Sequence, residues 1–263
     1  MRDNRRVPLG LSPAAFAALG ACVFFAGVVD ALAGGGGLIT LPAYLAAGLP
    51  PALVLGTNKL VSSIGTAASA ARYQRALRFP LRSFLPALAA ALAGAWLGAS
   101  LAVRADPRRL RPMLLCALPV LAWTLLTRRD FGAEDGSHRL SPSARRRRGA
   151  LVAGPVAFYD GFFGPGAGTF YALGLVRIGR HDLLGATARA KLLNSASNAA
   201  ALAAFVASGR VAWRVGLPMV AMSVAGNWTG SHLGLRRGAR AIRPAAALVC
   251  AGLFAKLLLD AWR

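Results

Sequence analysis

Long apolar stretches alternate with short basic segments along the whole of the 263-residue chain. A helix needs about 20 apolar residues to cross a hydrocarbon core of about 30 Å. Four stretches meet that length with at most one charged residue each: 14–33, 52–71, 84–103 and 150–176. The pattern predicts an all-α fold, that of a polytopic helical membrane protein.

We expect helical segments in two groups. In the first half they are 13–33, 38–48, 52–71, 84–103 and 110–127, and in the second half 150–163, 169–178, 184–208, 215–235 and 243–262. The segments 38–48 and 169–178 are too short to span a bilayer, and are either half-helices or one arm of a re-entrant hairpin. The remainder predicts about eight transmembrane helices, with four crossings in each half.

The two halves share a spacing that indicates duplication. Lys59 and Lys191 lie 132 residues apart, and several other pairs repeat the same offset. These pairs are Leu85-Pro86 with Leu217-Pro218, Gly94, Trp96 and Gly98 with Gly226, Trp228 and Gly230, and Arg111-Pro112 with Arg243-Pro244. We therefore predict a first membrane repeat over 13–127 and a second over 150–263, joined by a polar, basic connector at 128–149.

Four crossings per half place the N-terminal segment 1–12 and the connector on one side of the membrane. Both are rich in arginine, which indicates the cytoplasm. The alternative for the N-terminus is a signal peptide that ends near Ala33, with the arginines ahead of its apolar run. Cleavage there would remove Asp30, which has a counterpart in the second half, so a retained helix is favoured.

The composition is too apolar for a soluble globular domain of this length, with 56% hydrophobic residues and a mean hydropathy of +0.52. The net charge of +22 comes almost entirely from arginines between the apolar stretches. Such residues set orientation and contact anionic lipid headgroups, and no aromatic-interleaved face suggests nucleic acid. The three cysteines stand alone, so neither a disulfide framework nor a metal site is expected.

A carboxylate followed by glycines occurs once in each half. Asp30 precedes Gly34, Gly35, Gly36 and Gly37, and Asp160 precedes Gly164, Gly166 and Gly168. Glycine runs break a helix, and non-helical backbone at membrane depth survives only where protein or water satisfies it. The helix that follows a break presents free N–H groups, which favour an anion. The alternative is that these glycines only allow close helix packing.

A polar stripe follows each break at spacings of 0, 3, 4 and 7 residues, which lie on one helix face. The residues are Lys59, Ser62, Ser63 and Thr66 in the first half and Lys191, Asn194, Ser195 and Asn198 in the second. An intramembrane lysine is a functional-site hypothesis and needs a partner. We expect Asp30 to pair with Lys59 and Asp160 with Lys191. Purely structural ion pairs are the alternative.

These features favour a site for a small anion, bound by backbone N–H groups, an ammonium group and hydroxyl or amide side chains. Of the two lysines, Lys59 is favoured as the residue that contacts the substrate. A transmembrane aspartate can also carry a proton, which would couple transport to the proton gradient.

The motifs resemble those of the TauE/SafE family of sulfite-exporter-like permeases. The resemblance rests on D-A-L-A-G-G-G-G-L-I-T-L-P at 30–42, L-G-T-N-K at 55–59, Y-D-G-F-F-G-P-G-A-G-T-F at 159–170 and A-K-L-L-N at 190–194. It implies an inner-membrane carrier for small sulfur-containing anions, such as sulfite or organosulfonates. On this resemblance the glycine segments and the polar helices after them, with Asn58 beside Lys59, form the translocation path.

Other function classes fit the sequence less well. An enzyme is not expected, because neither a metal-binding His pattern nor a nucleophile elbow occurs, and the glycines at 164–168 do not follow a strand. No cofactor is expected. A selective anion channel or a non-transporting membrane subunit remains as the alternative to a carrier.

Overall fold

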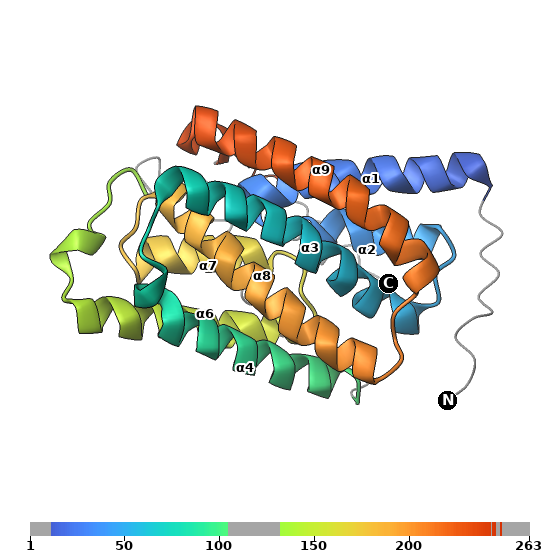
Figure 1. Cartoon of the computed structure of the whole chain (residues 1–263), viewed down its shortest axis with the longest axis horizontal. Helices are drawn as coiled ribbons and strands as arrows, with labels where there is room; N and C mark the ends of the chain where they lie inside the picture. Colours follow the sequence, from blue (N-terminus) through green and yellow to red (C-terminus); the bar gives the residue numbers. More distant parts are fainter. Residues whose placement is uncertain (1–11, 105–131, 243, 246–247, 249–263) are drawn as a thin grey trace, which may run out of the picture.

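In the computed structural model the described residues are 12–104, 132–242, 244–245 and 248, and every element among them is a helix (Figure 1). The α-helices are α1 (Pro13–Ala33), α2 (Gly37–Ala46), α3 (Pro51–Leu77), α4 (Leu85–Ala102), α6 (Pro142–Phe162), α7 (Ala167–Arg177), α8 (Leu183–Ala207) and α9 (Trp213–Arg237). Two 3-10 helices, η1 (Leu81–Phe84) and η3 (Ser137–Arg139), also lie among the described residues. The all-helical prediction is confirmed for these residues.

Helix bounds follow the predicted segments, with two extensions. Helix α3 continues to Leu77, and α6 begins at Pro142. The run of four arginines at 145–148 therefore lies in α6, although the prediction placed it in the connector. The early start has a local cause: the Ser141 side chain accepts a hydrogen bond from the Ala144 amide, and proline suits the first helical position. The predicted segment 110–127, and almost all of 243–262, lie outside the described residues.

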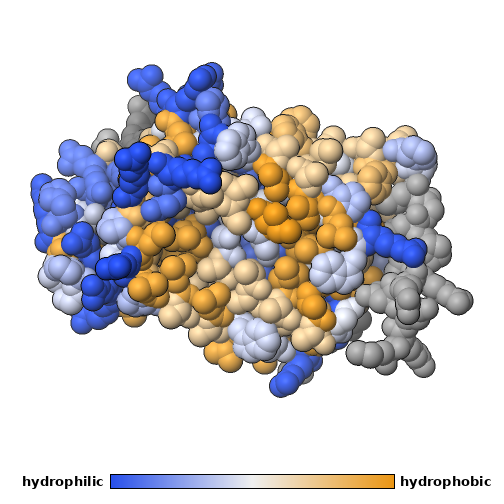
Figure 2. Space-filling model, in the orientation of Figure 1, coloured by the Kyte–Doolittle hydropathy of each residue, from blue (hydrophilic) through white to orange (hydrophobic). Residues whose placement is uncertain are grey.

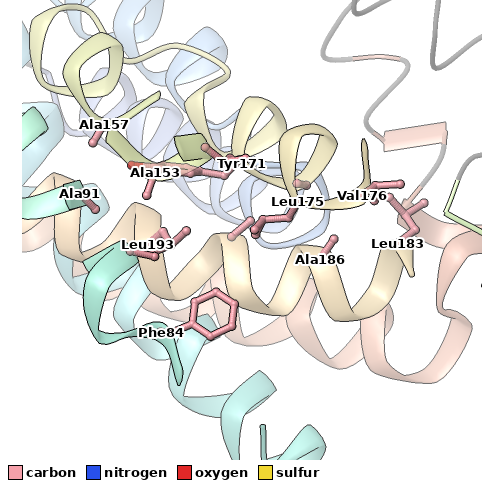
Figure 3. Packing of buried hydrophobic residues seen from close by; sticks show 14 of the residues in the cluster. Phe84, Ala91, Ala153, Ala157, Tyr171, Leu175, Val176, Leu183, Ala186 and Leu193 are labelled. Atoms are coloured by element: carbon pink, nitrogen blue, oxygen red, sulfur yellow. The ribbon is translucent and has the colours of Figure 1, made fainter. Parts of the chain in front are cut away.

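The described helices pack in two groups, and each group contains helices from both halves of the chain. Helix α9 packs on α1 and α3, and α4 packs on α6 and α8, while α3 and α8 run side by side between the groups. The largest core cluster joins α4, α6, α7 and α8, and Figure 3 shows Tyr171 and Leu175 of α7 facing Leu193 and Ala186 of α8. The core therefore requires both halves of the chain.

Glycines bring helices from different halves of the chain into backbone contact. A Cβ atom on Gly161 of α6 would lie 2.1 Å from the carbonyl oxygen of Ala95 in α4. A Cβ atom on Gly226 of α9 would lie 2.1 Å from the carbonyl oxygen of Phe24 in α1. Small residues at such crossings allow the close van der Waals packing that holds membrane helices together.

The contacts also fix the direction of each helix. Helices α1 and α9 are parallel, because Gly20 lies near Met222 and Val28 lies near Gly230. Helices α4 and α6 are likewise parallel, with Ala87 near Gly149 and Ala95 near Gly161. Helices α3 and α8 are antiparallel, since Lys59 contacts Asn198 while Gly56 lies near Phe205. In Figure 1, α1 accordingly begins at the right and α6 begins at the left.

The prediction that the N-terminal helix and the connector start on one side is therefore wrong. Helix α2 folds back toward the end at which α1 begins, so that α3 starts there as well. One cluster contains the start of α1, the end of α2 and the starts of α3 and α9: Leu19, Val23, Leu41, Tyr44, Leu49, Val54, Ala212 and Val215. Helices α1 and α2 thus leave and return to the same end of the bundle, an arrangement that the prediction of four crossings in the first half did not include.

The surface is apolar around the middle of the bundle and polar at its ends. Figure 2 shows apolar residues over the middle and hydrophilic residues gathered at the end that holds the start of α6. Large side chains such as Phe25, Leu97 and Leu151 are exposed. Among the described helices, Pro13–Ala33 and Leu81–Ala102 are long and apolar enough to cross a membrane by length and composition. The exposed apolar belt suits contact with lipid.

The packing of α6 predicts different costs for two glycine substitutions on the same helix. Gly161→Ala forces backbone apart at Ala95 and should lower the free energy of unfolding by about 1–3 kcal/mol. Gly154→Ala is the control, because its new Cβ atom would lie 4.0 Å from the nearest atom, Ala90 Cβ. Thermal unfolding of the purified protein in detergent measures both. Equal effects would contradict the close α4–α6 contact.

Candidate functional site

The two glycine breaks meet at the centre of the molecule. Gly34 ends α1 with φ of 82°, and Gly164 and Gly166 connect α6 to α7 with φ of 101° and 78°. A Cβ atom on Gly34 would lie 2.2 Å from the carbonyl carbon of Gly168, so the two segments touch backbone to backbone. Glycine is required here both for the left-handed conformation and for the close approach.

The helices after the breaks begin with free backbone donors. Within the described residues, the amides of Gly37 in α2 and of Gly168 and Thr169 in α7 have no hydrogen-bond acceptor. The first turn of a helix also carries the positive end of its dipole. The meeting point of the breaks therefore offers donors from two helix starts.

Asp160 in α6 is buried in a full set of donors. Its Oδ1 lies 2.6 Å from Nζ of Lys59, and its Oδ2 accepts from Asn194 Nδ2 at 3.0 Å and from the Ser197 hydroxyl. The Lys59 ammonium group also donates to Asn198 Oδ1 at 2.8 Å. Both charged side chains are almost completely buried, at 3% and 2% exposure. This ion pair is enclosed and well satisfied.

Asp30 in α1 forms the second ion pair with longer contacts. Its Oδ2 lies 3.1 Å from Nζ of Lys191 and accepts from the Thr66 hydroxyl at 3.2 Å. Its Oδ1 accepts from the Gly36 amide at 3.4 Å. The Asp30 side chain is 14% exposed, whereas Lys191 is fully buried. The Asp30 pair is thus the looser and more accessible of the two.

The predicted partners of the lysines are wrong, because each lysine pairs with the aspartate of the other half. Helices α3 and α8 are antiparallel neighbours, and each passes the glycine break of the opposite half. A Cβ atom on Gly164 would lie only 3.1 Å from Nζ of Lys59, which places that ammonium group beside the second break. The ion pairs consequently join the two halves rather than stabilise each one.

The remaining predicted residues divide into those at the ion pairs and those beside them. Asn194 and Asn198 contact the ion pairs directly, and Asn58 accepts from the Thr40 hydroxyl at 2.6 Å. Ser63 donates to the carbonyl of Lys59 in its own helix. Ser62 and Ser195 are half-buried, and their hydroxyl groups make no hydrogen bond within the described residues. The stripe is thus only partly engaged.

Sequence reasoning missed several side chains of the site. Ser197 contacts Asp160, but the residue 132 positions earlier is Gly65, so the duplication gives no signal for it. Thr169 donates to the carbonyl of Ala33, and Tyr159 donates to the carbonyl of Pro165 at 2.6 Å. These two residues and Thr40 lie inside the quoted glycine motifs and could have been found there.

Comparison with known proteins identifies the family. The sequence profile described as "Sulfite exporter TauE/SafE" matches residues 19–257. The chain belongs to the TauE/SafE family. It is 38% identical over 238 residues to the "Probable membrane transporter protein ORF9" of Sinorhizobium sp, covering 90% of each chain. No solved structure matches it.

Two further relatives carry similar names. The "Probable membrane transporter protein YfcA" of Escherichia coli (strain K12) is 38% identical over 251 residues, 95% of this chain and 92% of the relative. A "Probable membrane transporter protein" of Haemophilus influenzae is 37% identical over 240 residues, 91% of this chain and 93% of the relative. TauE/SafE proteins form a membrane transporter family, so the comparisons support a transporter rather than an enzyme.

The crossed ion pairs predict which double substitutions are tolerated. Lys59→Met leaves Asp160 buried without its cation and should cost about 3–5 kcal/mol of stability. Adding Asp160→Asn should recover most of that loss, because the uncompensated charge is removed. Adding Asp30→Asn instead should recover nothing. Thermal unfolding of the single and double variants measures the coupling. If Asp30→Asn restored the stability of Lys59→Met and Asp160→Asn did not, the result would contradict the observed pairing.

Proposed function

We propose that this TauE/SafE protein is a secondary transporter for a small anion, moved together with a proton across the bacterial inner membrane. The observation that carries the proposal is the meeting of two helix breaks with two crossed Lys–Asp pairs at the centre of the bundle. The family description supports a sulfur-containing substrate such as sulfite or an organosulfonate.

The substrate site is proposed at Lys191 rather than at Lys59. Lys59 has two acceptors, Asp160 and Asn198, whereas the only acceptor of Lys191 among the described residues is Asp30. An ammonium group has three N–H donors, so Lys191 keeps two for a ligand. Its partner is also the more exposed aspartate. These differences favour the Asp30–Lys191 pair as the one that opens.

Charge balance is the reason to expect a proton. The two lysines and two aspartates together are neutral, and the buried site has no further charged partner within the described residues. An anion that binds there adds an uncompensated negative charge, which is costly in a low-dielectric interior. Protonation of Asp30 removes one negative charge and releases Lys191 to hold the anion. Anion and proton would therefore enter the site together.

Inverted repeats are proposed as the transport framework. The shared spacing matches α1 with α6, α3 with α8 and α4 with α9, and the matched helices α1 and α6 run in opposite directions. The packing of α1 on α9 then corresponds to the packing of α6 on α4. Transporters built this way bind substrate at broken helices near the midplane and alternate access by rocking one unit against the other.

The arginines support a cytoplasmic location for the end that holds the connector. That end carries a large set of described arginines: Arg72, Arg75, Arg78, Arg82, Arg145, Arg146, Arg147, Arg148, Arg177, Arg180, Arg189, Arg236, Arg237 and Arg240. The described arginines at the other end are Arg104, Arg210 and Arg214. The positive-inside rule then places the start of α1 on the periplasmic side, opposite to the expectation from the sequence.

This orientation predicts the labelling of two exposed positions in a background without the native cysteines. Ala133→Cys in the connector should react with a membrane-impermeant thiol reagent only from the cytoplasmic side. Ser208→Cys, between α8 and α9, should react only from the periplasmic side. Intact cells and inverted vesicles supply the two directions. Labelling of both positions from one side would contradict the inverted arrangement.

Transport itself is tested in proteoliposomes with radiolabelled sulfite, organosulfonates and carboxylates, with and without a proton gradient. The double variant Lys191→Met, Asp30→Asn should fold, but should bind substrate roughly ten- to a hundredfold more weakly, because a charge-assisted contact is lost. The matched double variant Lys59→Met, Asp160→Asn should keep more of the native affinity. Native affinity in the Lys191 variant would sink the proposed site, and flux independent of the proton gradient would indicate a channel.

A further inference from the structure

A second polar cavity lies at the connector end, away from the crossed ion pairs. Its volume is about 50 Å³, and it is enclosed by segments that are distant in the sequence. The polar residues that line it are Ser83 of η1, Ser137 of η3, Arg145 of α6, His181 between α7 and α8, and Arg189 of α8. Phe84 and Leu175 form part of the apolar wall.

Among the described residues Arg189 makes no salt bridge, although the charges of Asp135 and Asp182 lie near enough to act on it. Its guanidinium group lies over the ring of Phe79 at 4.7 Å and over that of Phe84 at 5.7 Å. One Nη1 hydrogen bond goes to the carbonyl of Gly185 at 3.0 Å, and Nε is buried with no acceptor among the described residues. A buried charged donor left unpaired is unfavourable, which makes this group a preformed partner for an anion.

His181 supplies a second unsatisfied group. The side chain is 7% exposed, and its Nδ1 has no hydrogen bond among the described residues. The nearest carboxylate oxygen, Oδ1 of Asp135, lies 3.8 Å away and already accepts from the Ser137 amide at 2.8 Å. Burial, with the nearby Arg189 charge, lowers the pKa of His181 to about 4. The imidazole is therefore neutral at pH 7, and it can donate through Nδ1–H.

We propose that this cavity binds one small tetrahedral oxyanion, such as inorganic phosphate or sulfate. Arg189 and Arg145 supply the positive charge, and His181 supplies a further hydrogen bond. The acids nearby are engaged elsewhere: Asp135 accepts from Ser137, and Asp182 caps α8 through the Gly185 amide. A volume of about 50 Å³ holds more than one water molecule, which suits a small anion.

Occupancy would join four parts of the chain at one end of the bundle. The ligand would contact η1, the connector, α6 and α8, and Arg189 lies on the same helix as Lys191. The connector would then be fixed to the helices that surround the central ion pairs. This site is independent of the proposed transport function, since its residues contact neither of the crossed ion pairs.

The test is thermal unfolding of the purified full chain in lipid-free detergent, with phosphate or sulfate compared with chloride at equal ionic strength. Both oxyanions should raise the melting temperature of the native protein more than chloride does. The increase should disappear in Arg189→Gln and in Arg145→Gln. The increase should persist in Arg147→Gln, because Arg147 is an exposed arginine of α6, the helix of Arg145, and does not line the cavity. Equilibrium dialysis with labelled phosphate should show binding weakened roughly ten- to a hundredfold in Arg189→Gln.

Three results would overturn the proposal. The first is an equal rise in melting temperature with oxyanion in Arg189→Gln and in the native protein. The second is loss of that rise in the double variant Lys191→Met, Asp30→Asn, which would place the anion at the central ion pairs. The third is stabilisation by phosphatidylglycerol micelles but not by free phosphate, which would assign the arginines to a lipid headgroup. If Arg189→Gln does not fold, Arg145→Gln decides the question.

Discussion

The rest of the structure depends on two ion pairs that are buried in the interior of the helical bundle. A charged side chain at that depth needs a partner, and here each partner comes from the other half of the chain. This requirement fixes α3 beside α8 and brings the two glycine breaks together. Because a buried ion pair gains little net stability over apolar packing, its presence at the breaks points to a role in function.

The two pairs are unequal, and the inequality follows from the sequence. Asp160 has Asn194 and Ser197 as donors, whereas the residues 132 positions earlier are Ser62 and Gly65. Ser62 makes no hydrogen bond within the described residues, and glycine has no side chain to offer. Asp30 is therefore left with longer contacts and more exposure. The Asp160 carboxylate is thus held by shorter contacts and is more deeply buried than the Asp30 carboxylate.

The sequence predicted most of the described helices and the four charged residues that form the ion pairs, because apolar run length and polar stripes depend on local spacing alone. It did not predict which aspartate meets which lysine, since that depends on the antiparallel packing of α3 on α8. It also misjudged helix direction, because the pattern of a ten-residue segment such as α2 does not say whether the chain continues onward or folds back. Ser197 escaped notice because the repeat offers Gly65 in its place.

The packing of α9 on α1, and of α4 on α6, has a consequence for synthesis in the cell. Helix α1 leaves the ribosome first, but α9, the helix on which it packs, begins only at Trp213. At about 5–20 residues per second, α1 waits on the order of ten seconds or more for this partner. During that time Asp30 also lacks Lys191. An acidic, glycine-ended helix therefore lacks these folded-state contacts until α8 and α9 have been made.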